Sequence, residues 1–146
     1  MKSGKLILVR GLPGTGKSTI ASRLAVDLGF VHLETDKLFM ADGEYDFNVY
    51  QIEKYHDMCV DAAHTLKADG WNVVVSNMFT EMWEMERYDF DLIIRTKGIC
   101  FANTHNVPDR VVASMEERFV DVDAELYAEG RYILCRQEIL QRLKKS

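Results

Sequence analysis

The sequence contains few cysteines, and none of them stands in a paired motif. Cys59, Cys100 and Cys135 are odd in number, lie far apart and form no C-x-x-C pair. This spacing is not that of a disulfide framework or of a zinc site. We therefore expect reduced structural thiols in a cytoplasmic protein that binds no zinc.

Long apolar runs and an excess of basic residues are also missing. The N-terminus leads into a four-residue apolar run, Leu6 to Val9, that ends at Arg10. A run of this length is too short for a signal peptide or a membrane span, so no membrane partner is expected. The net charge of −5 gives no general attraction to nucleic acid. Binding to nucleic acid would need a local basic patch.

The composition is otherwise that of an ordinary globular protein. The chain has 146 residues, of which 47% are hydrophobic and 28% charged. This length is enough to bury a core, and no repeat, low-complexity stretch or linker divides the chain. We predict a single domain spanning residues 1–146, and the sequence leaves its oligomeric state open.

One glycine-rich stretch organises the chain. Residues 11–18 read GLPGTGKS, which is the full G-x-x-x-x-G-K-[ST] pattern, between an apolar run and a predicted helix. In that context the pattern predicts a loop whose backbone N–H groups hold phosphates, with the lysine at the β- and γ-phosphates and the serine hydroxyl on Mg²⁺. We therefore expect ATP and Mg²⁺ as cofactors. The predicted contact residues are Gly11, Pro13, Gly14, Thr15, Gly16, Lys17, Ser18 and Thr19.

Strands and helices alternate along most of the chain. The predicted strands are residues 5–10, 30–34, 71–76 and 91–95, with helices over 18–28, 48–69 and 81–88 between them. This alternation predicts an α/β P-loop NTPase fold of the nucleotide-kinase type, in three layers, with a short, mostly parallel sheet of about four strands. In residues 96–108 the apolar residues recur at neither helical nor strand spacing, and this segment is interpreted as a lid. The pattern predicts a C-terminal helical segment from Ala124 to Ser146.

The sequence lacks the signature motifs of two classes of triphosphate-binding protein. A GTPase would carry an N-K-x-D motif, and a motor ATPase would carry an acid at the end of a buried strand. The third predicted strand instead ends in Ser76 and Asn77. The acid at a strand end is Asp36, which a parallel sheet would place in the same crevice as Lys17. Asp36 could accept the proton of an attacking hydroxyl, hold Mg²⁺, or simply cap the next turn.

Three segments together resemble a known family. Residues 11–19, the run Glu34-Thr35-Asp36, and residues 103–108 are similar to small P-loop kinases. These are related to the kinase domain of bacteriophage polynucleotide kinase and to the kinase domains of zeta toxins and NEDD-ligase-binding proteins. The resemblance implies a phosphotransferase in which Lys17, as a catalytic residue, and Ser18 lie at the phosphates and Mg²⁺, and in which Asp36 is the base. It also implies that residues 103–108 close over the nucleotide. Apart from the resemblance, His105 in the predicted lid is a candidate phosphate contact or simply a turn residue. Aromatic residues after Asp36 and around Trp83 could stack on a base, which makes a nucleotide or polynucleotide 5′-hydroxyl a plausible acceptor.

The sequence departs from that family at several cationic positions. Phe39 stands where the polynucleotide kinases have an arginine, and Phe101-Ala102 replace their lid arginines. Arg95, with Lys97, is a candidate nucleotide contact that could replace them, although charged residues at a strand end are often merely solvated. Three functions therefore remain open: a kinase, an ATP-binding module that acts through a partner, and a simple ATPase.

Overall fold

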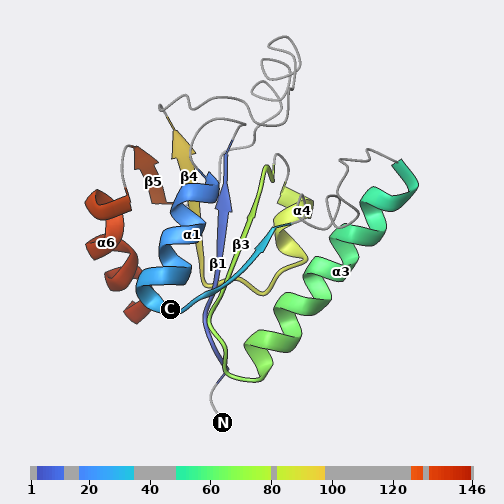
Figure 1. The fold of residues 1–146 in the computed structure, drawn as a ribbon, viewed down its shortest axis with the longest axis horizontal. Coiled ribbons are helices and arrows are strands. Elements are labelled where there is room, and N and C mark those ends of the chain that lie inside the picture. The colour runs from blue at the N-terminus through green and yellow to red at the C-terminus, as the bar shows by residue number, and fades with distance from the viewer. Residues whose placement is uncertain are drawn as a thin grey trace.

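A five-stranded parallel sheet forms the centre of the fold (Figure 1). The computed structural model describes residues 3–11, 17–34, 49–79, 82–97, 126–129 and 132–145. The strands, in chain order, are β1 (Leu6–Arg10), β2 (Val31–Glu34), β3 (Val73–Asn77), β4 (Leu92–Lys97) and β5 (Leu126–Glu129). Their order across the sheet is β2-β3-β1-β4-β5.

The register brings the carboxyl ends of the strands to one edge of the sheet. Arg10 at the end of β1 lies opposite Asn77 of β3 on one side and Arg95 of β4 on the other. Glu34 at the end of β2 lies opposite Ser76 of β3. Ligands of open parallel sheets bind outside this edge, so these end residues mark where a site is expected.

One face of the sheet is covered by α1 (Lys17–Leu28) and α6 (Tyr132–Lys145). Apolar side chains from both helices and from alternate strand positions form one buried cluster. Its members include Ile7, Val9, Ile20, Leu24, Val74, Ile94 and Ile139. Gly29 has a φ of 74° and ends α1 as a left-handed cap, which glycine adopts without strain.

The other face is covered by α3 (Val49–Ala68) and the short α4 (Met82–Glu86). The remaining strand positions, including Leu6, Leu8, Val73, Val75 and Ile93, pack there against Cys59, Val60, Ala63 and Met85. Strands that are buried on both faces read as continuous apolar runs, as β1 and β3 do in the sequence. None of the described helices is long and apolar enough to cross a membrane.

The C-terminal prediction was wrong in one part. The pattern predicts helix throughout residues 124–146, but Leu126–Glu129 forms β5, and helix α6 begins only at Tyr132. β5 pairs in parallel with the end of β4, with Ile94 opposite Leu126. Four residues are too few to show a period, and pairing with an available strand edge overrides the helical preference of Leu, Ala and Glu. The sheet therefore has one strand more than the sequence predicted.

The boundary between strand and lid was also misplaced. β4 runs to Lys97, so Thr96 and Lys97 belong to the strand and not to the predicted lid. Thr96 is buried, and its hydroxyl donates a hydrogen bond of 3.3 Å to the carbonyl of Arg10, which ties the ends of β4 and β1 together. The rest of the predicted lid, residues 98–108, lies outside the described residues.

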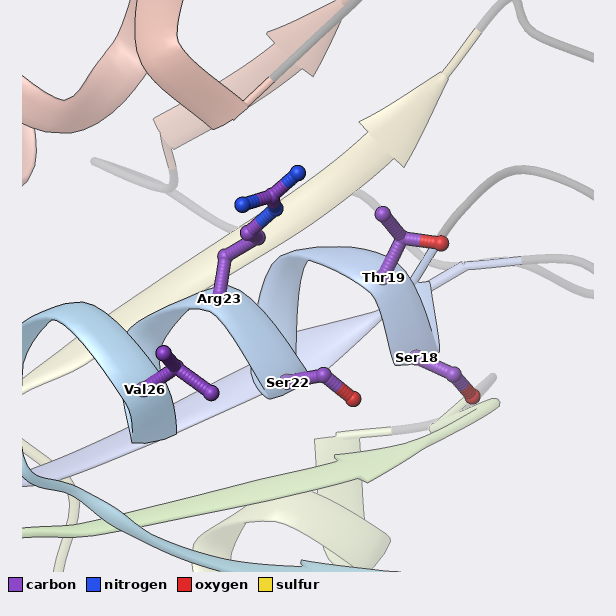
Figure 2. Close-up of a pocket in the computed structure, with 5 residues that line it drawn as sticks. All are labelled: Ser18, Thr19, Ser22, Arg23 and Val26. Atoms are coloured by element: carbon purple, nitrogen blue, oxygen red, sulfur yellow. The ribbon is translucent and has the colours of Figure 1, made fainter.

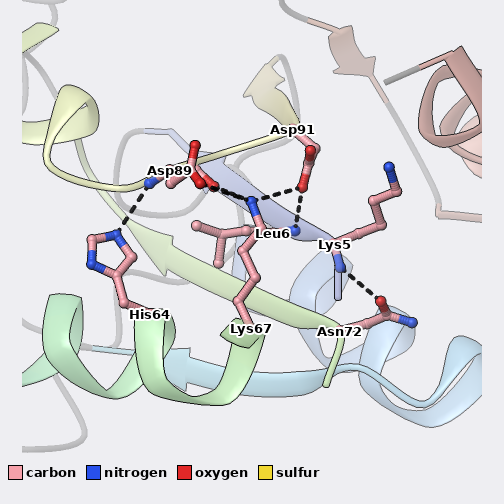
Figure 3. A network of polar contacts seen from close by, with 7 residues as sticks. All are labelled: Lys5, Leu6, His64, Lys67, Asn72, Asp89 and Asp91. Carbon is pink, nitrogen blue, oxygen red and sulfur yellow. Dashed lines mark hydrogen bonds and ion pairs between the residues drawn. The ribbon is translucent and has the colours of Figure 1, made fainter. Parts of the chain in front are cut away.

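A polar network joins α3 to the amino-terminal ends of β1 and β4 (Figure 3). Lys67 of α3 is 9% exposed, donates a hydrogen bond of 2.5 Å to the carbonyl of Asp89, and lies 3.2 Å from Oδ2 of Asp91. The same Asp91 oxygen accepts a hydrogen bond of 2.9 Å from the backbone N–H of Leu6. One lysine thus joins the start of β1, the start of β4 and the end of α3.

Replacing Lys67 is expected to destabilise the fold. Lys67→Met keeps the apolar stem but leaves the half-buried Asp91 carboxylate without its cation, which should cost about 2 kcal/mol of unfolding free energy. Urea unfolding followed by circular dichroism measures this loss. Lys54→Met, at an exposed position of the same helix, is the matched control and should be nearly neutral. Equal unfolding midpoints for the two variants would contradict the role of Lys67.

Candidate functional site

The two ends of the glycine-rich loop are held by buried residues. Gly11 follows β1 directly and is buried, and Lys17 opens α1 with only 8% of its surface exposed. Residues 12–16 lie outside the described residues, so the predicted contacts Pro13, Gly14, Thr15 and Gly16 are not placed. The strand-to-helix context that the phosphate-loop motif requires is therefore present on both sides of the loop.

Ser18 contacts an acid that the sequence analysis did not single out. Its hydroxyl donates a hydrogen bond of 2.8 Å to Oε1 of Glu34, at the end of β2. Both partners carry oxygen, the ligand type that Mg²⁺ prefers. Asp36, two residues further along the chain, lies outside the described residues, as does His105. The contact between Ser18 and Glu34 brings the end of β2 to the start of α1, and the position of Asp36 beside Lys17 stays a prediction.

Arg95 lies at the same edge of the sheet but on the other face. It shares its face of β4 with Ile93, which packs with α3 and α4, whereas α1 covers the opposite face. Its register partner on β1 is Arg10, which is fully buried. The described residues thus place Ser18 and Arg95 on different sides of the sheet edge. A nucleotide contact by Arg95 stays a prediction.

The end of β3 carries neutral polar side chains that are already hydrogen-bonded. Ser76 is fully buried, and its hydroxyl lies 2.7 Å from Nε2 of His32 on β2. The side-chain oxygen of Asn77 accepts a hydrogen bond of 2.8 Å from the N–H of Met78, and its amide lies 3.4 Å from Nδ1 of His56 on α3. Sequence reasoning missed both histidine contacts, because nothing in the sequence reveals which strands become neighbours or which helix side chains reach them.

A pocket lies along the outer side of α1, beginning at its first turn (Figure 2). It has a volume of about 390 Å³. The described residues that line it are Ser18, Thr19, Ser22, Arg23 and Val26. Ser18 and Thr19 lie at the first turn of α1, Ser22 and Arg23 lie one turn further along, and Val26, which is 85% exposed, lies at the far end. The lining therefore offers three hydroxyl groups and a guanidinium over the first two turns of α1 and an apolar side chain beyond them.

The described residues can supply only part of a metal site. Among them, no group of three His, Cys, Asp or Glu side chains lies close enough together to hold a metal ion. Mg²⁺ is commonly bound by one or two protein oxygens together with the phosphates of a nucleotide. The Ser18–Glu34 pair fits that kind of shared site and not a site built from protein alone.

Comparison with known proteins places this architecture in a family. A model of the AAA-domain family matches residues 6–118, which include the phosphate loop and four of the strands. The chain belongs to this family. The matched segment of the AAA domain ends before β5, so the strand that the sequence analysis missed lies beyond it.

Two relatives of this AAA domain show how far the similarity reaches. Human NEDD4-binding protein 2 is 34% identical over 85 residues, which are 57% of this chain and 5% of that protein. A Caenorhabditis elegans homologue of adenylate kinase isoenzyme 6 is 33% identical over 99 residues, which are 60% of this chain and 50% of that protein. The chain therefore spans half or less of the length of these two relatives.

Solved structures confirm the predicted fold. The APS kinase CysC of Mycobacterium tuberculosis, in complex with AMPPNP and APS, superposes with a TM-score of 0.68 and covers 99% of both chains. Its sequence is 16% identical, so the match concerns the fold alone. The α/β P-loop architecture predicted from the sequence is thereby confirmed for this AAA domain.

Proposed function

We propose that the chain is an ATP-dependent phosphotransferase that moves the γ-phosphoryl group to a hydroxyl acceptor. The observation that carries the proposal is the contact between Ser18 and Glu34, which joins the start of α1 to the end of β2. This contact brings the phosphate-loop serine to the strand that leads into Asp36. Donor phosphate, metal ligands and acceptor base are the three parts that phosphoryl transfer requires in one place.

The proposal assigns roles at the phosphates, the acceptor hydroxyl and the metal to four residues. Lys17 neutralises charge on the β- and γ-phosphates, and Asp36 accepts the proton of the acceptor hydroxyl. Ser18 and Glu34, with Asp36, hold Mg²⁺ either directly or through its water molecules. When bound, Mg²⁺ would neutralise charge that develops on the phosphates. The Ser18 hydroxyl donates a hydrogen bond to Glu34. The lone pairs of its oxygen therefore point away from that contact and can face a cation.

The acceptor we propose is a nucleotide or a polynucleotide 5′-hydroxyl, as in the polynucleotide kinases that the sequence resembles. Support comes from the run Glu34-Thr35-Asp36, whose first residue ends β2, and from relatives that include an adenylate kinase isoenzyme homologue. The net charge of −5 favours a short acceptor over a long duplex, because a polyanion would be repelled away from the site.

A second candidate is an ATP-binding module that transfers little phosphate and acts through a partner. One specific observation favours it. The end of β3 carries the buried Ser76, hydrogen-bonded to His32, at a position where an acid would help to hold the metal. Together with the missing lid arginines, this leaves fewer charged groups to stabilise a transition state.

The deciding experiment incubates the protein with γ-labelled ATP, Mg²⁺ and a panel of acceptors. The panel contains 5′-hydroxyl DNA and RNA oligonucleotides, nucleosides, nucleoside monophosphates and neutral sugars. Label on the nucleotide or oligonucleotide class alone supports the proposal. Label on none of them, with ATP still bound, supports the binding module. Release of labelled phosphate to water in every tube would indicate an ATPase.

Glu34 provides a test of the metal assignment. Glu34→Gln keeps the size of the side chain but removes its charge, so the Mg²⁺ concentration for half-maximal ATP binding should rise about tenfold. Affinity for ATP without Mg²⁺ should change little. The measurement is a Mg²⁺ titration with a fluorescent ATP analogue. Glu86→Gln, at an exposed position of α4, is the matched control, and equal titration curves for the two variants would refute the assignment.

A further inference from the structure

We propose that Arg23 binds the phosphate of the nucleotide nearest the nucleoside, from inside the pocket on α1. This inference rests on the proposed ATP site, and it assigns a cation that the motif itself does not include. Arg23 would supply, from α1, a positive charge at the phosphates. The polynucleotide kinases have lid arginines where this chain has residues 101 and 102, which are uncharged.

The position of Arg23 on α1 directs its side chain toward the first turn of the helix. It follows Thr19 by four residues, so the two share one face of α1 (Figure 2). Side chains on a helix lean toward its N-terminus, and the turn that separates these residues is about 5.4 Å. The guanidinium can therefore reach back to the first turn, where the phosphate loop ends.

The usual helical partner of Arg23 is already engaged by another helix. Asp27 stands four residues after Arg23, a spacing at which opposite charges normally pair. Instead, Nε of Arg136 on α6 donates a hydrogen bond of 2.5 Å to Oδ2 of Asp27. In the part of the chain that the structure describes, Arg23 forms neither an ion pair nor a hydrogen bond. The pair between Asp27 and Arg136 thus leaves the guanidinium in the pocket.

The chemistry of the pocket fits a phosphate oxygen. Thr19 and Ser22 offer hydroxyl donors beside a guanidinium, which binds phosphate through two parallel hydrogen bonds. Lys17 serves the β- and γ-phosphates, and Ser18 serves the metal between them. With these two residues assigned, Arg23, one turn further along α1, is assigned to the α-phosphate. Val26, at the end of the pocket, offers an apolar surface for the nucleoside.

The first test measures nucleotide affinity by titration calorimetry in Arg23→Ala and Arg23→Lys. We expect Arg23→Ala to weaken ATP and ADP equally, by about tenfold, because one charge-assisted contact to a shared phosphate is lost. Arg23→Lys should recover part of that loss, since it restores the charge but not the bidentate geometry. Unchanged ATP affinity in Arg23→Ala would overturn the proposal, as would a loss for ATP alone, which would place the contact at the γ-phosphate.

The second test uses the competition for Asp27. Arg136→Gln releases Asp27, which should then pair with Arg23 and weaken ATP binding although α6 is remote from the loop motif. Adding Asp27→Asn to that variant should restore affinity, because no carboxylate remains to hold Arg23. Thermal unfolding of each variant shows whether it is folded. Weak binding in a folded double variant would overturn the inferred competition.

Lys17→Ala separates this inference from the proposed function. If Lys17→Ala loses ATP binding while Arg23→Ala does not, the ATP site stands and the role of Arg23 is wrong. If Lys17→Ala binds ATP as wild type does, the ATP site itself is wrong.

Discussion

Lys17→Ala is expected to reduce ATP affinity by about two orders of magnitude and to remove phosphoryl transfer. The physical reason is the position of the ammonium group. Lys17 is 8% exposed at the start of α1, where its charge is poorly screened by water and close to the loop that should hold the phosphates. No neighbouring side chain in the motif can replace it, because the other loop residues are uncharged.

The measurement is ATP titration calorimetry, followed by the labelled-transfer assay with the best acceptor. Lys54→Ala is the matched control, since it removes the same charge from an exposed position of α3 and should behave as wild type. A folded Lys17→Ala variant that binds ATP as tightly as Lys54→Ala would contradict the phosphate site. Circular dichroism of both variants distinguishes lost binding from lost folding.

The parts of the fold that could be predicted are those with a local signature. β1 and β3 are continuous apolar runs, and α1 and α3 are followed by Gly29 and Gly70, both with positive φ. The phosphate loop is recognised because its residue types and its flanking strand and helix lie in one stretch of sequence. These features depend on neighbours along the chain, which the sequence shows directly.

The parts that could not be predicted depend on neighbours in space. β5 is a strand because β4 offers it an edge, and Leu126–Glu129 carries no strand signature of its own. Glu34 belongs to a run that resembles the kinase family, but the sequence assigns it no contact, and only the crossover through α1 sets its carboxylate 2.8 Å from the Ser18 hydroxyl. The same holds for Asp27, whose partner Arg136 is 109 residues away. Long-range pairs of this kind determine which charged side chains lie at the site, and no local sequence pattern reveals them.

Asp36→Asn is expected to lower the rate of phosphoryl transfer by about two to four orders of magnitude. The residue follows β2 by two positions, and the end of β2 is fixed near the phosphate loop by the contact between Glu34 and Ser18. An amide of the same size cannot accept the proton of the acceptor hydroxyl. Because Asp36 is proposed to act mainly on the acceptor, affinity for ATP should change far less than the transfer rate does.

Single-turnover transfer with enzyme in excess over labelled ATP measures the chemical step without product release. Asp61→Asn, at an exposed position of α3, is the matched control and should transfer at the wild-type rate. An unchanged rate in Asp36→Asn would remove this residue as the base. A normal rate at saturating Mg²⁺ with a loss at low Mg²⁺ would assign Asp36 to the metal alone. The distinction matters because Glu34 already supplies one carboxylate at Ser18, and an Asp36 that served only the metal would leave the proposed reaction without a base.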